Sequence, residues 1–591
     1  MIKIYKRAIK DCITADRGCC AMIGILIILG YIGAITPVIM ARLIEAGESF
    51  IKHGASASAV WHQLIILLGV YAVSGMTYIL ATPLDKLLIQ KGSWKFQERL
   101  FKKMCSIPQI LLEDSKYFDS YKRAAEAVKN SGYENGVNSL LGILRVSTTF
   151  LDSIIMTVIS IIILVSFSPY LLIFAVLSTP LSMLISIFSE KAMRKLRRAQ
   201  THKKRETEYV WGLFCQKASV KEMRVFGASG FFRRKWLKKR DEMINEELSV
   251  RAKILRFRNG ADIIKNIFYG MNVALAVVLM IRGHLSIGQF TACLGVFGTL
   301  QINLVVFVDQ LEYFSESLHI AEEYYDFIDL PDKLDGTADF GGFNDKITLS
   351  GVSFSYPNTE KAALDNINLT IKKGEHIVIV GENGSGKTTL SKLITACYEP
   401  DSGNITIDGQ KISDLKKNSY LKNFSVVSQN FVQYNMTLRE NIAMSETGAM
   451  YDDERIKAAV KAAGVDDIAD IMGGYDVQLG REFGGVELSG GQWQKLAIAR
   501  GMFRDAPVII LDEPTAALDP FIEYEILTDF SEMAKDRTSI IISHRIGICS
   551  KADRIIVMKD GQIVEDGTHK ELLDKGGEYC RMWSAQSDWY K

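Results

Sequence analysis

A glycine-rich segment directly after an apolar run holds the residue types that bind a phosphate chain. It reads Gly381-Glu-Asn-Gly-Ser-Gly-Lys387-Thr388-Thr389 and follows a predicted strand over His376–Val380. Glycines let successive backbone N–H groups wrap a phosphate, and the helix that follows directs its positive end at it. In this pattern the lysine reaches the β- and γ-phosphates, and the threonine hydroxyl can ligate Mg²⁺. We therefore expect a nucleotide to be bound by Gly381, Asn383, Gly384, Ser385, Gly386, Lys387, Thr388 and Thr389.

Two acidic residues follow a second apolar run, Val508–Leu511. A carboxylate at the end of a buried strand beside the phosphate loop suits Mg²⁺, so Asp512 is a candidate metal ligand. The next carboxylate, Glu513, is placed to polarise a water for in-line attack on the γ-phosphate. Together with the phosphate loop, this pair predicts nucleotide hydrolysis.

A second glycine turn, Leu488-Ser-Gly-Gly-Gln492, lies upstream of these carboxylates. It opens a predicted helix over Trp493–Arg504, so Ser489–Gln492 form a second helix N-terminus that can receive an anion. The same half of the chain contains further short β-branched runs separated by helical patterns, which predicts an α/β P-loop domain over 346–591 with a largely buried sheet. These further strands are expected at Ile347–Leu349, Ser539–Ser543 and Arg554–Val557.

The first half of the chain has the composition of an all-α membrane domain, over residues 1–330. It contains six apolar stretches, each near the roughly 20 residues that cross a bilayer as a helix. A Gly/Asp-rich linker is expected over 331–345. The predicted spans are residues 20–41, 61–83, 146–167, 169–189, 259–281 and 288–311.

Charge divides the chain in the same place. Residues 1–330 carry 41 Lys+Arg against 28 Asp+Glu, whereas 331–591 carry 29 against 40. Within the first half, basic residues gather before the first span, in 84–144 (ten) and in 190–258 (21). Basic loops stay on the cytoplasmic side, so both termini and the second domain are expected in the cytoplasm. The basic segments lack aromatic interleaving and a binding fold, which argues against nucleic acid as a partner.

Three ionisable residues lie in or beside the predicted spans: Arg145, Asp152 and Asp309. Such residues are candidates for a substrate pathway, and acidic walls would favour a cationic substrate. The alternative interpretation is a structural pair or side chains that reach to the membrane surface. The sequence leaves both open.

These motifs and spans together resemble an ATP-binding cassette (ABC) half-transporter of the exporter fold, over essentially the whole chain. The resemblance implies that Tyr356 stacks on adenine and that Gln429 contacts Mg²⁺ and the γ-phosphate. It also implies that Glu513 is the general base and that His544 contacts the γ-phosphate. Finally, Ser489, Gly490, Gly491 and Gln492 would close on the ATP of a partner subunit, and Asp519 would couple the two sites.

Because one chain supplies one cassette and six spans, the resemblance implies a dimer. The intact set of catalytic residues favours a homodimer, and a heterodimer is the alternative. Two cytoplasmic segments, Ser115–Asp119 and Val220–Gly227, resemble the short coupling helices that dock on the cassettes. ATP and Mg²⁺ are the expected cofactors, and membrane lipid and a transported substrate are the other expected partners.

The sequence departs from the common exporter pattern at two places, and in both it resembles lantibiotic and modified-peptide exporters. Gly480-Arg-Glu-Phe-Gly-Gly485 replaces the usual segment before the signature, and Trp493 replaces the usual arginine after it. The expected function is therefore ATP-driven export of a peptide or small amphipathic molecule across the bacterial cytoplasmic membrane. The alternatives are an exporter-fold importer of a metal chelate and a soluble regulatory ABC ATPase.

Overall fold

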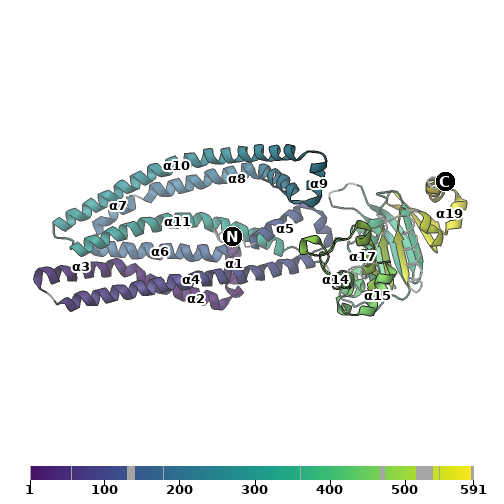
Figure 1. Cartoon of the computed structure of the whole chain (residues 1–591), viewed down its shortest axis with the longest axis horizontal. Coiled ribbons are helices and arrows are strands. Elements are labelled where there is room, and N and C mark those ends of the chain that lie inside the picture. The colour runs from purple at the N-terminus through teal and green to yellow at the C-terminus, as the bar shows by residue number, and fades with distance from the viewer. Residues whose placement is uncertain are drawn as a thin grey trace. The chain divides into compact units, whose positions relative to one another are not determined.

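The computed structural model forms two compact units, which are described separately (Figure 1). One unit comprises residues 1–104 and 120–330, and the other comprises residues 105–119 and 331–591. The structure describes residues 2–54, 56–128, 140–177, 179–333, 335–357, 359, 361–465, 473–513, 537–544 and 546–587.

The first unit is entirely helical in the part that the structure describes, as expected for its membrane domain. Its helices run roughly alongside one another in Figure 1. The two longest, α10 and α4, have 53 and 50 residues, or about 80 and 75 Å at the usual rise per residue. Both therefore exceed the roughly 30 Å of bilayer hydrocarbon and continue beyond it. The elements are α1 (Ile2–Ala15), α2 (Arg17–Gly30), η1 (Tyr31–Ile35), α3 (Thr36–His53), α4 (Ala57–Ser106), α5 (Ser115–Val128), α6 (Gly142–Phe167), η3 (Pro169–Leu171), α7 (Leu172–Leu177), α8 (Thr179–Cys215), α9 (Lys217–Val225), α10 (Ser229–Ile281) and α11 (Ile287–Ile328).

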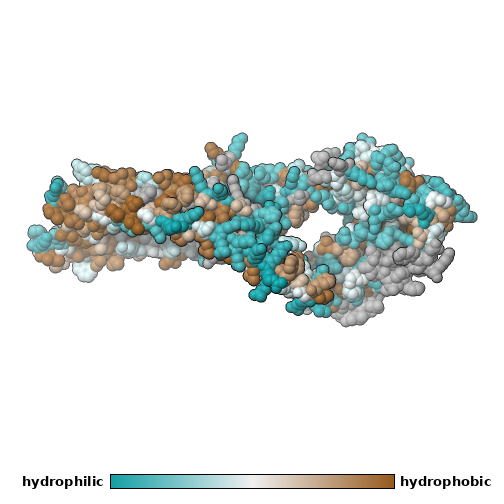
Figure 2. Space-filling view, turned by 90° about the horizontal axis from the view of Figure 1, so that it is seen from above, coloured by the Kyte–Doolittle hydropathy of each residue, from teal (hydrophilic) through white to brown (hydrophobic). Residues whose placement is uncertain are grey.

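Five helical segments of the described chain are long and apolar enough to cross a membrane, and five of the six predicted spans lie within them. The other predicted span, residues 169–189, is shared among η3, α7 and α8, with residue 178 outside the described residues. Figure 2 shows hydrophobic side chains gathered over the surface of the long helices. The five segments are residues 17–53, 57–106, 142–167, 229–281 and 287–328.

Glycines allow close helix packing in this unit. A Cβ at Gly33 would lie 2.4 Å from the Ser74 hydroxyl, and one at Gly288 would lie 2.2 Å from the carbonyl oxygen of Ala41. Small residues at such contacts let helix backbones approach closely inside a bilayer. Gly33 and Gly288 are thus packing positions, whereas a Cβ at Gly24 or Gly75 would meet nothing within 4 Å among the described residues.

The second unit has the expected α/β architecture and contains two sheets. The larger has the strand order β10-β9-β3-β8-β7-β6, in which β10 is antiparallel to β9 and the other pairs are parallel. The smaller is antiparallel, in the order β2-β1-β4-β5. The strands are β1 (Lys346–Phe354), β2 (Leu364–Lys372), β3 (His376–Gly381), β4 (Ser402–Ile407), β5 (Gln410–Lys411), β6 (Phe424–Val427), β7 (Val508–Asp512), β8 (Thr538–Ile542), β9 (Arg554–Lys559) and β10 (Gln562–Gly567).

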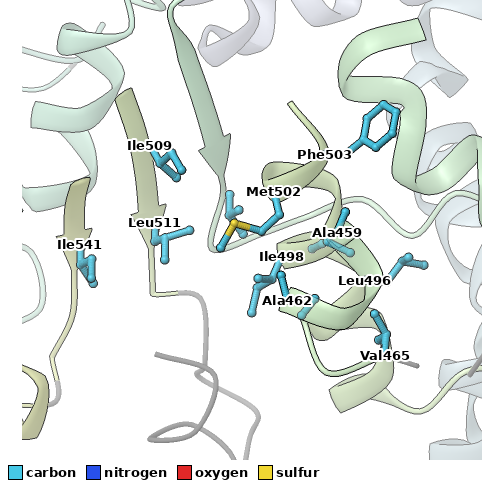
Figure 3. Packing of buried hydrophobic residues seen from close by; sticks show 14 of the residues in the cluster. Ala459, Ala462, Val465, Leu496, Ile498, Met502, Phe503, Ile509, Leu511 and Ile541 are labelled. Atoms are coloured by element: carbon cyan, nitrogen blue, oxygen red, sulfur yellow. The ribbon is translucent and has the colours of Figure 1, made fainter. Parts of the chain in front are cut away.

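Helices cover these sheets and bury their apolar faces. Figure 3 shows part of one core, where Ile498 and Met502 lie on the side of the strand residues Ile509 and Leu511. Trp493 is only 6% exposed in the same cluster, so this departure from the common pattern is a packing residue. The helices are η2 (Gln109–Glu113), α12 (Lys387–Ile394), η4 (Ile412–Asp414), α13 (Lys417–Leu421), α14 (Leu438–Ala443), η5 (Met444–Ala449), α15 (Asp453–Ala462), η6 (Arg481–Phe483), α17 (Gly490–Phe503), η7 (Ile546–Lys551), α19 (His569–Lys575) and α20 (Glu578–Ser587).

Candidate nucleotide-binding site

The phosphate loop connects β3 to α12 and requires glycine at two positions. Gly381 has φ 156° and Gly386 has φ 100°, a region that favours glycine. A Cβ at Gly381 would lie 2.2 Å from the Met558 carbonyl oxygen, and one at Gly386 would lie 2.6 Å from that of Ala363. Within the loop, Ser385 is buried, while Asn383 and Gly384 lie exposed at its rim. The expected glycine-rich turn therefore has the backbone that a phosphate needs.

Lys387 is held by the loop that precedes it. Its side chain is buried, and its Nζ donates to the carbonyl oxygens of Gly381 and Glu382, each at 2.9 Å. Burial lowers the pKa of the Lys387 ammonium below its usual value, although the carboxylates of Glu513 and Asp512 act in the opposite direction. Among the described residues, the hydrogen-bond acceptors of this buried cation are neutral, so it is well suited to gain a phosphate as a counter-ion.

Thr388 and Asp512 meet beside this lysine. The Thr388 hydroxyl donates to Asp512 Oδ1 at 3.2 Å, and Asp512 is 4% exposed as the last residue of β7. Burial raises the pKa of the Asp512 carboxyl above its usual value, and nearby Glu513 raises it further, against the effects of Thr388 and Lys387. A hydroxyl and a carboxylate side by side are oxygen donors of the kind that Mg²⁺ prefers.

Glu513 lies at the centre of a polar cluster just beyond the strand ends. Its Oε2 accepts a hydrogen bond from Gln429 Nε2 at 2.6 Å, and His544 Nδ1 lies 3.4 Å from its Oε1. Gln429 follows β6, Glu513 follows β7 and His544 follows β8, so the parallel strands bring the three together. Glu513 also has a positive φ of 48°, a strained backbone conformation that is common at functional sites.

Tyr356 lies next to the start of α12. Its hydroxyl is 3.2 Å from the Thr389 hydroxyl, and its ring stands edge-on to Phe354 and Tyr398, with centroids 5.2 and 5.7 Å away. An aromatic ring beside the phosphate loop is a suitable platform for a nucleobase. The structure thus places the predicted adenine contact within the same site.

The sequence did not single out Tyr398, which joins this aromatic cluster to residues 105–119 of the same unit. The Tyr398 hydroxyl donates to Glu113 Oε1 at 2.5 Å, and Lys392 Nζ lies 3.2 Å from that hydroxyl. Ile110 packs against the cassette core. These contacts lie in and around η2, and the predicted coupling segment Ser115–Asp119, which follows η2 and begins α5, belongs to the same unit. The second predicted coupling segment begins in α9.

The predicted second anion site is an exposed helix N-terminus. Ser489 caps α17, because its hydroxyl accepts from Gln492 N at 3.3 Å while its own N–H donates to Gln492 Oε1 at 2.9 Å. Ser489 and Gly490 are exposed, and Gly491 is partly exposed. The helix begins at Gly490 and ends at Phe503, slightly earlier at each end than predicted. Asp519 lies outside the described residues.

The three ionisable residues of the membrane unit lie on two helices that pack together. Arg145 and Asp152 belong to α6 and Asp309 belongs to α11. Two residues before each aspartate, Phe150 and Phe307 stack with centroids 5.0 Å apart. That these residues line a substrate cavity stays a prediction.

Comparisons with known proteins agree with this architecture. Residues 19–304 match a family model for the ABC transporter transmembrane region, and residues 364–516 match one for the ABC transporter. The chain is 22% identical to a solved bacterial Atm1-family ABC exporter with ATP bound, with a TM-score of 0.73 over 96% of this chain and 98% of that one. This likeness shows the exporter fold.

Several named proteins are similar in sequence. The chain is 34% identical to the nisin transport ATP-binding protein NisT of Lactococcus lactis subsp. lactis, over 65% of each chain, which is just under two thirds of the length of NisT. It is 29% identical to the subtilin transport ATP-binding protein SpaT of Bacillus subtilis, over 84% of this chain and 80% of that one. It is also 29% identical to the ATP-dependent lipid A-core flippase of Ralstonia nicotianae, over 95% of this chain and 93% of that one.

Proposed function

Because this chain belongs to the ABC transporter family, we propose that it is one half of an ATP-driven exporter in the bacterial cytoplasmic membrane. One observation carries the proposal: Gln429 and His544 hold Glu513 in place beside the phosphate loop. Long apolar helices occupy the other half of the same chain. A hydrolytic site joined to a membrane domain is what a primary active transporter requires.

Each residue described above has a proposed role in binding the nucleotide. Backbone N–H groups of the phosphate loop hold the phosphates, Lys387 neutralises their charge and Tyr356 stacks on adenine. Mg²⁺, when bound, supplies charge for the β- and γ-phosphate oxygens. The oxygen atoms of Thr388, Asp512 and Gln429 are the donors that would hold it.

Glu513 is the proposed general base of hydrolysis. Its carboxylate accepts a proton from water as the water oxygen bonds to the γ-phosphorus and the bond to the leaving β-phosphate oxygen breaks. Gln429 fixes the orientation of that carboxylate through its 2.6 Å hydrogen bond. His544, on the neighbouring strand end, is placed to contact the γ-phosphate.

Two copies are proposed to share each closed site. The exposed Ser489–Gly491 turn offers an uncovered helix N-terminus, which attracts anions. It would complete the phosphate site of a partner, and Asp519 would link the two sites. Since one chain holds every residue that the reaction needs, we propose a homodimer.

The proposed cargo is a peptide or a small amphipathic molecule. Support comes from three relatives: NisT is a nisin transport protein, SpaT is a subtilin transport protein, and the Ralstonia protein is a lipid A-core flippase. The proposed orientation, with the cassette in the cytoplasm, rests on the 21 basic residues of 190–258.

Substrate flux in oriented vesicles tests this proposal. The protein would be reconstituted with its cassettes facing outward, and ATP would be added outside with a labelled cationic peptide or a fluorescent lipid. Export predicts ATP-dependent transfer of one probe into the lumen or to the inner leaflet, and the Glu513→Gln protein provides the inactive control. ATP-dependent movement out of preloaded vesicles would indicate import instead.

A further inference from the structure

The last described helix, α20, contacts two loops of the nucleotide site that lie far from it in the sequence. Gln586 bonds to the backbone of the loop that carries His544. Arg581 pairs with Glu382 of the phosphate loop, with Nη2 and Oε1 2.7 Å apart. No motif in the sequence marked either residue.

Gln586 provides hydrogen-bond partners for two backbone groups that lie beyond the end of a sheet strand. Its Nε2 donates to the carbonyl oxygen of His544 at 2.6 Å, and its Oε1 accepts from the N–H of Ile546 at 2.8 Å. Both groups follow β8, which ends at Ile542. Ile546 is only 1% exposed, so its N–H needs a partner from the protein. The side-chain amide thus supplies a partner for both backbone groups.

The opposite end of α20 is fixed in the core. The carboxylate of Glu565, which is 8% exposed, accepts from the N–H groups of Glu578 and Tyr579, each at 2.9 Å. The Tyr579 ring is fully buried, and its hydroxyl lies 2.6 Å from His569 Nδ1. A helix anchored in this way presents Gln586 from a rigid base.

The ion pair between Arg581 and Glu382 adds little stability, but it fixes the position of α20 relative to the phosphate loop. The side chains of Arg581 and Glu382 are 59% and 62% exposed, and exposed ion pairs stabilise little. The pair nevertheless joins α20 to the phosphate loop. The same helix therefore spans the distance between the phosphate loop and the His544 loop.

We propose that Gln586 is a positioning residue for ATP hydrolysis, which fixes the backbone groups of His544 and Ile546 and so holds His544 beside Glu513. The proposal rests on the proposed function, because it assigns a role to Gln586 only if this cassette hydrolyses ATP. His544 itself would contact the nucleotide, and Gln586 acts through it.

Two substitutions separate positioning from simple stability. Gln586→Ala removes both hydrogen bonds, whereas Gln586→Glu retains an acceptor for the Ile546 N–H but cannot donate to the His544 carbonyl. Ala585→Gln, at the exposed neighbouring position, is the matched control. All variants are full-length and reconstituted, and the measurements are kcat, KM for ATP, binding of a fluorescent ATP analogue and the thermal midpoint.

We expect kcat to fall about tenfold in both Gln586 variants, since orienting hydrogen bonds of this kind have effects of that order on a barrier. KM and analogue binding stay within about twofold of the wild type, and Gln586→Glu and Ala585→Gln melt close to it. If Gln586→Ala does not fold, Gln586→Glu decides alone. A kcat within twofold of wild type in Gln586→Glu, or an equal loss in Ala585→Gln, overturns the proposal.

A Glu513→Gln protein assayed in parallel separates this proposal from the one on which it rests. If the wild type hydrolyses ATP, Glu513→Gln does not, and the Gln586 variants are normal, only the positioning role is refuted. If the wild type has no ATPase activity, or Glu513→Gln hydrolyses normally, the proposed function and the positioning role both fail.

Discussion

Gln429 and Glu513 are joined by a 2.6 Å hydrogen bond across the carboxyl ends of the neighbouring strands β6 and β7. The bond leaves Glu513 Oε1 on the side of His544, whose Nδ1 lies 3.4 Å away. A carboxylate held from both sides in this way has little freedom to turn away from a reacting water. The arrangement makes separate predictions for each of its members.

Replacing the base should abolish turnover while the nucleotide still binds. Glu513→Gln keeps the size of the side chain and can still bond to Gln429, but an amide does not accept the proton of the attacking water. ATPase activity should fall by about 10²-fold or more, and binding of an ATP analogue should change little. Glu454→Gln, an exposed glutamate in α15, is the matched control. Near-normal steady-state hydrolysis would refute the assignment of Glu513.

Charge at position 429 should matter more than loss of the side chain. Gln429→Glu sets a second carboxylate against Glu513 at hydrogen-bond distance, and like charges this close repel. Gln429→Ala removes the orienting bond and the oxygen proposed for Mg²⁺, but it introduces no charge. We therefore expect ATPase activity to decrease in the order wild type, Gln429→Ala, Gln429→Glu, with about tenfold between the first two. Equal rates for the two variants would contradict this account of the hydrogen bond.

Local sequence patterns were sufficient to predict the core of this site. The glycine pattern around Lys387 and the carboxylates after Val508–Leu511 each depend on neighbours in the chain, and the structure places them beside one another. The fold class could be predicted in the same way. Long apolar stretches are typical of helices that cross a membrane, and short β-branched runs are typical of buried strands. Strands such as β2 were not predicted, since exposed polar residues interrupt its apolar positions.

Contacts between distant segments had no such signal. Glu113 and Tyr398 are 285 residues apart, and Gln586 and His544 are 42 apart. Glutamate, tyrosine and glutamine are common surface residues, and nothing around them in the sequence distinguishes these three. Only the fold shows that they have partners, so the aromatic cluster and the α20 contact were found from the structure.

Burial of Asp512 predicts that this carboxylate destabilises the nucleotide-free protein to an extent that depends on pH. The pKa of the Asp512 carboxyl is raised in the folded state. Above that pKa the charged carboxylate lowers the free energy of unfolding, and this loss of stability disappears as the pH falls through the pKa. Nucleotide-free Asp512→Asn should therefore melt up to a few degrees higher than wild type at pH 8, with a difference that shrinks as the pH is lowered. Stabilisation by Mg-ATP should be lost in the variant.

The control for this prediction is Asp574→Asn, an exposed aspartate in α19. Its midpoint should follow that of the wild type at every pH, since solvent screens an exposed carboxylate. Thermal unfolding of the full-length protein in detergent measures both variants. A lower midpoint for Asp512→Asn than for wild type at pH 8 would contradict the argument from burial.

The hydroxyl of Tyr398 should hold residues 105–119 on the cassette. Tyr398→Phe keeps the ring stacked on Phe354, with centroids 5.3 Å apart, but removes the donor to the Glu113 carboxylate. Hydrogen bonds to charged groups contribute about 1.5–3 kcal/mol. Amide hydrogen exchange in η2 should therefore rise at least several-fold, while binding of an ATP analogue stays near the wild-type value.

Tyr451→Phe provides the control for this change, because Tyr451 is 84% exposed. It should leave exchange in η2 unaltered. Unchanged exchange in Tyr398→Phe would show that apolar contacts such as that of Ile110 suffice to hold the segment.

Sharing of each closed site between two copies predicts complementation. Lys387→Met damages the phosphate loop and Ser489→Arg blocks the signature turn, so homodimers of either variant contain two defective sites and should be inactive. A mixed dimer contains one site with both defects and one intact site, built from the unaltered loop of one copy and the unaltered turn of the other. The mixed dimer is purified through two different tags, one on each copy, and its ATPase activity is measured. Because it has one intact site and the wild type has two, its rate should be up to about half the wild-type rate. Inactive mixed dimers would mean that each copy works alone, and failure of the tagged copies to co-purify would favour the heterodimer.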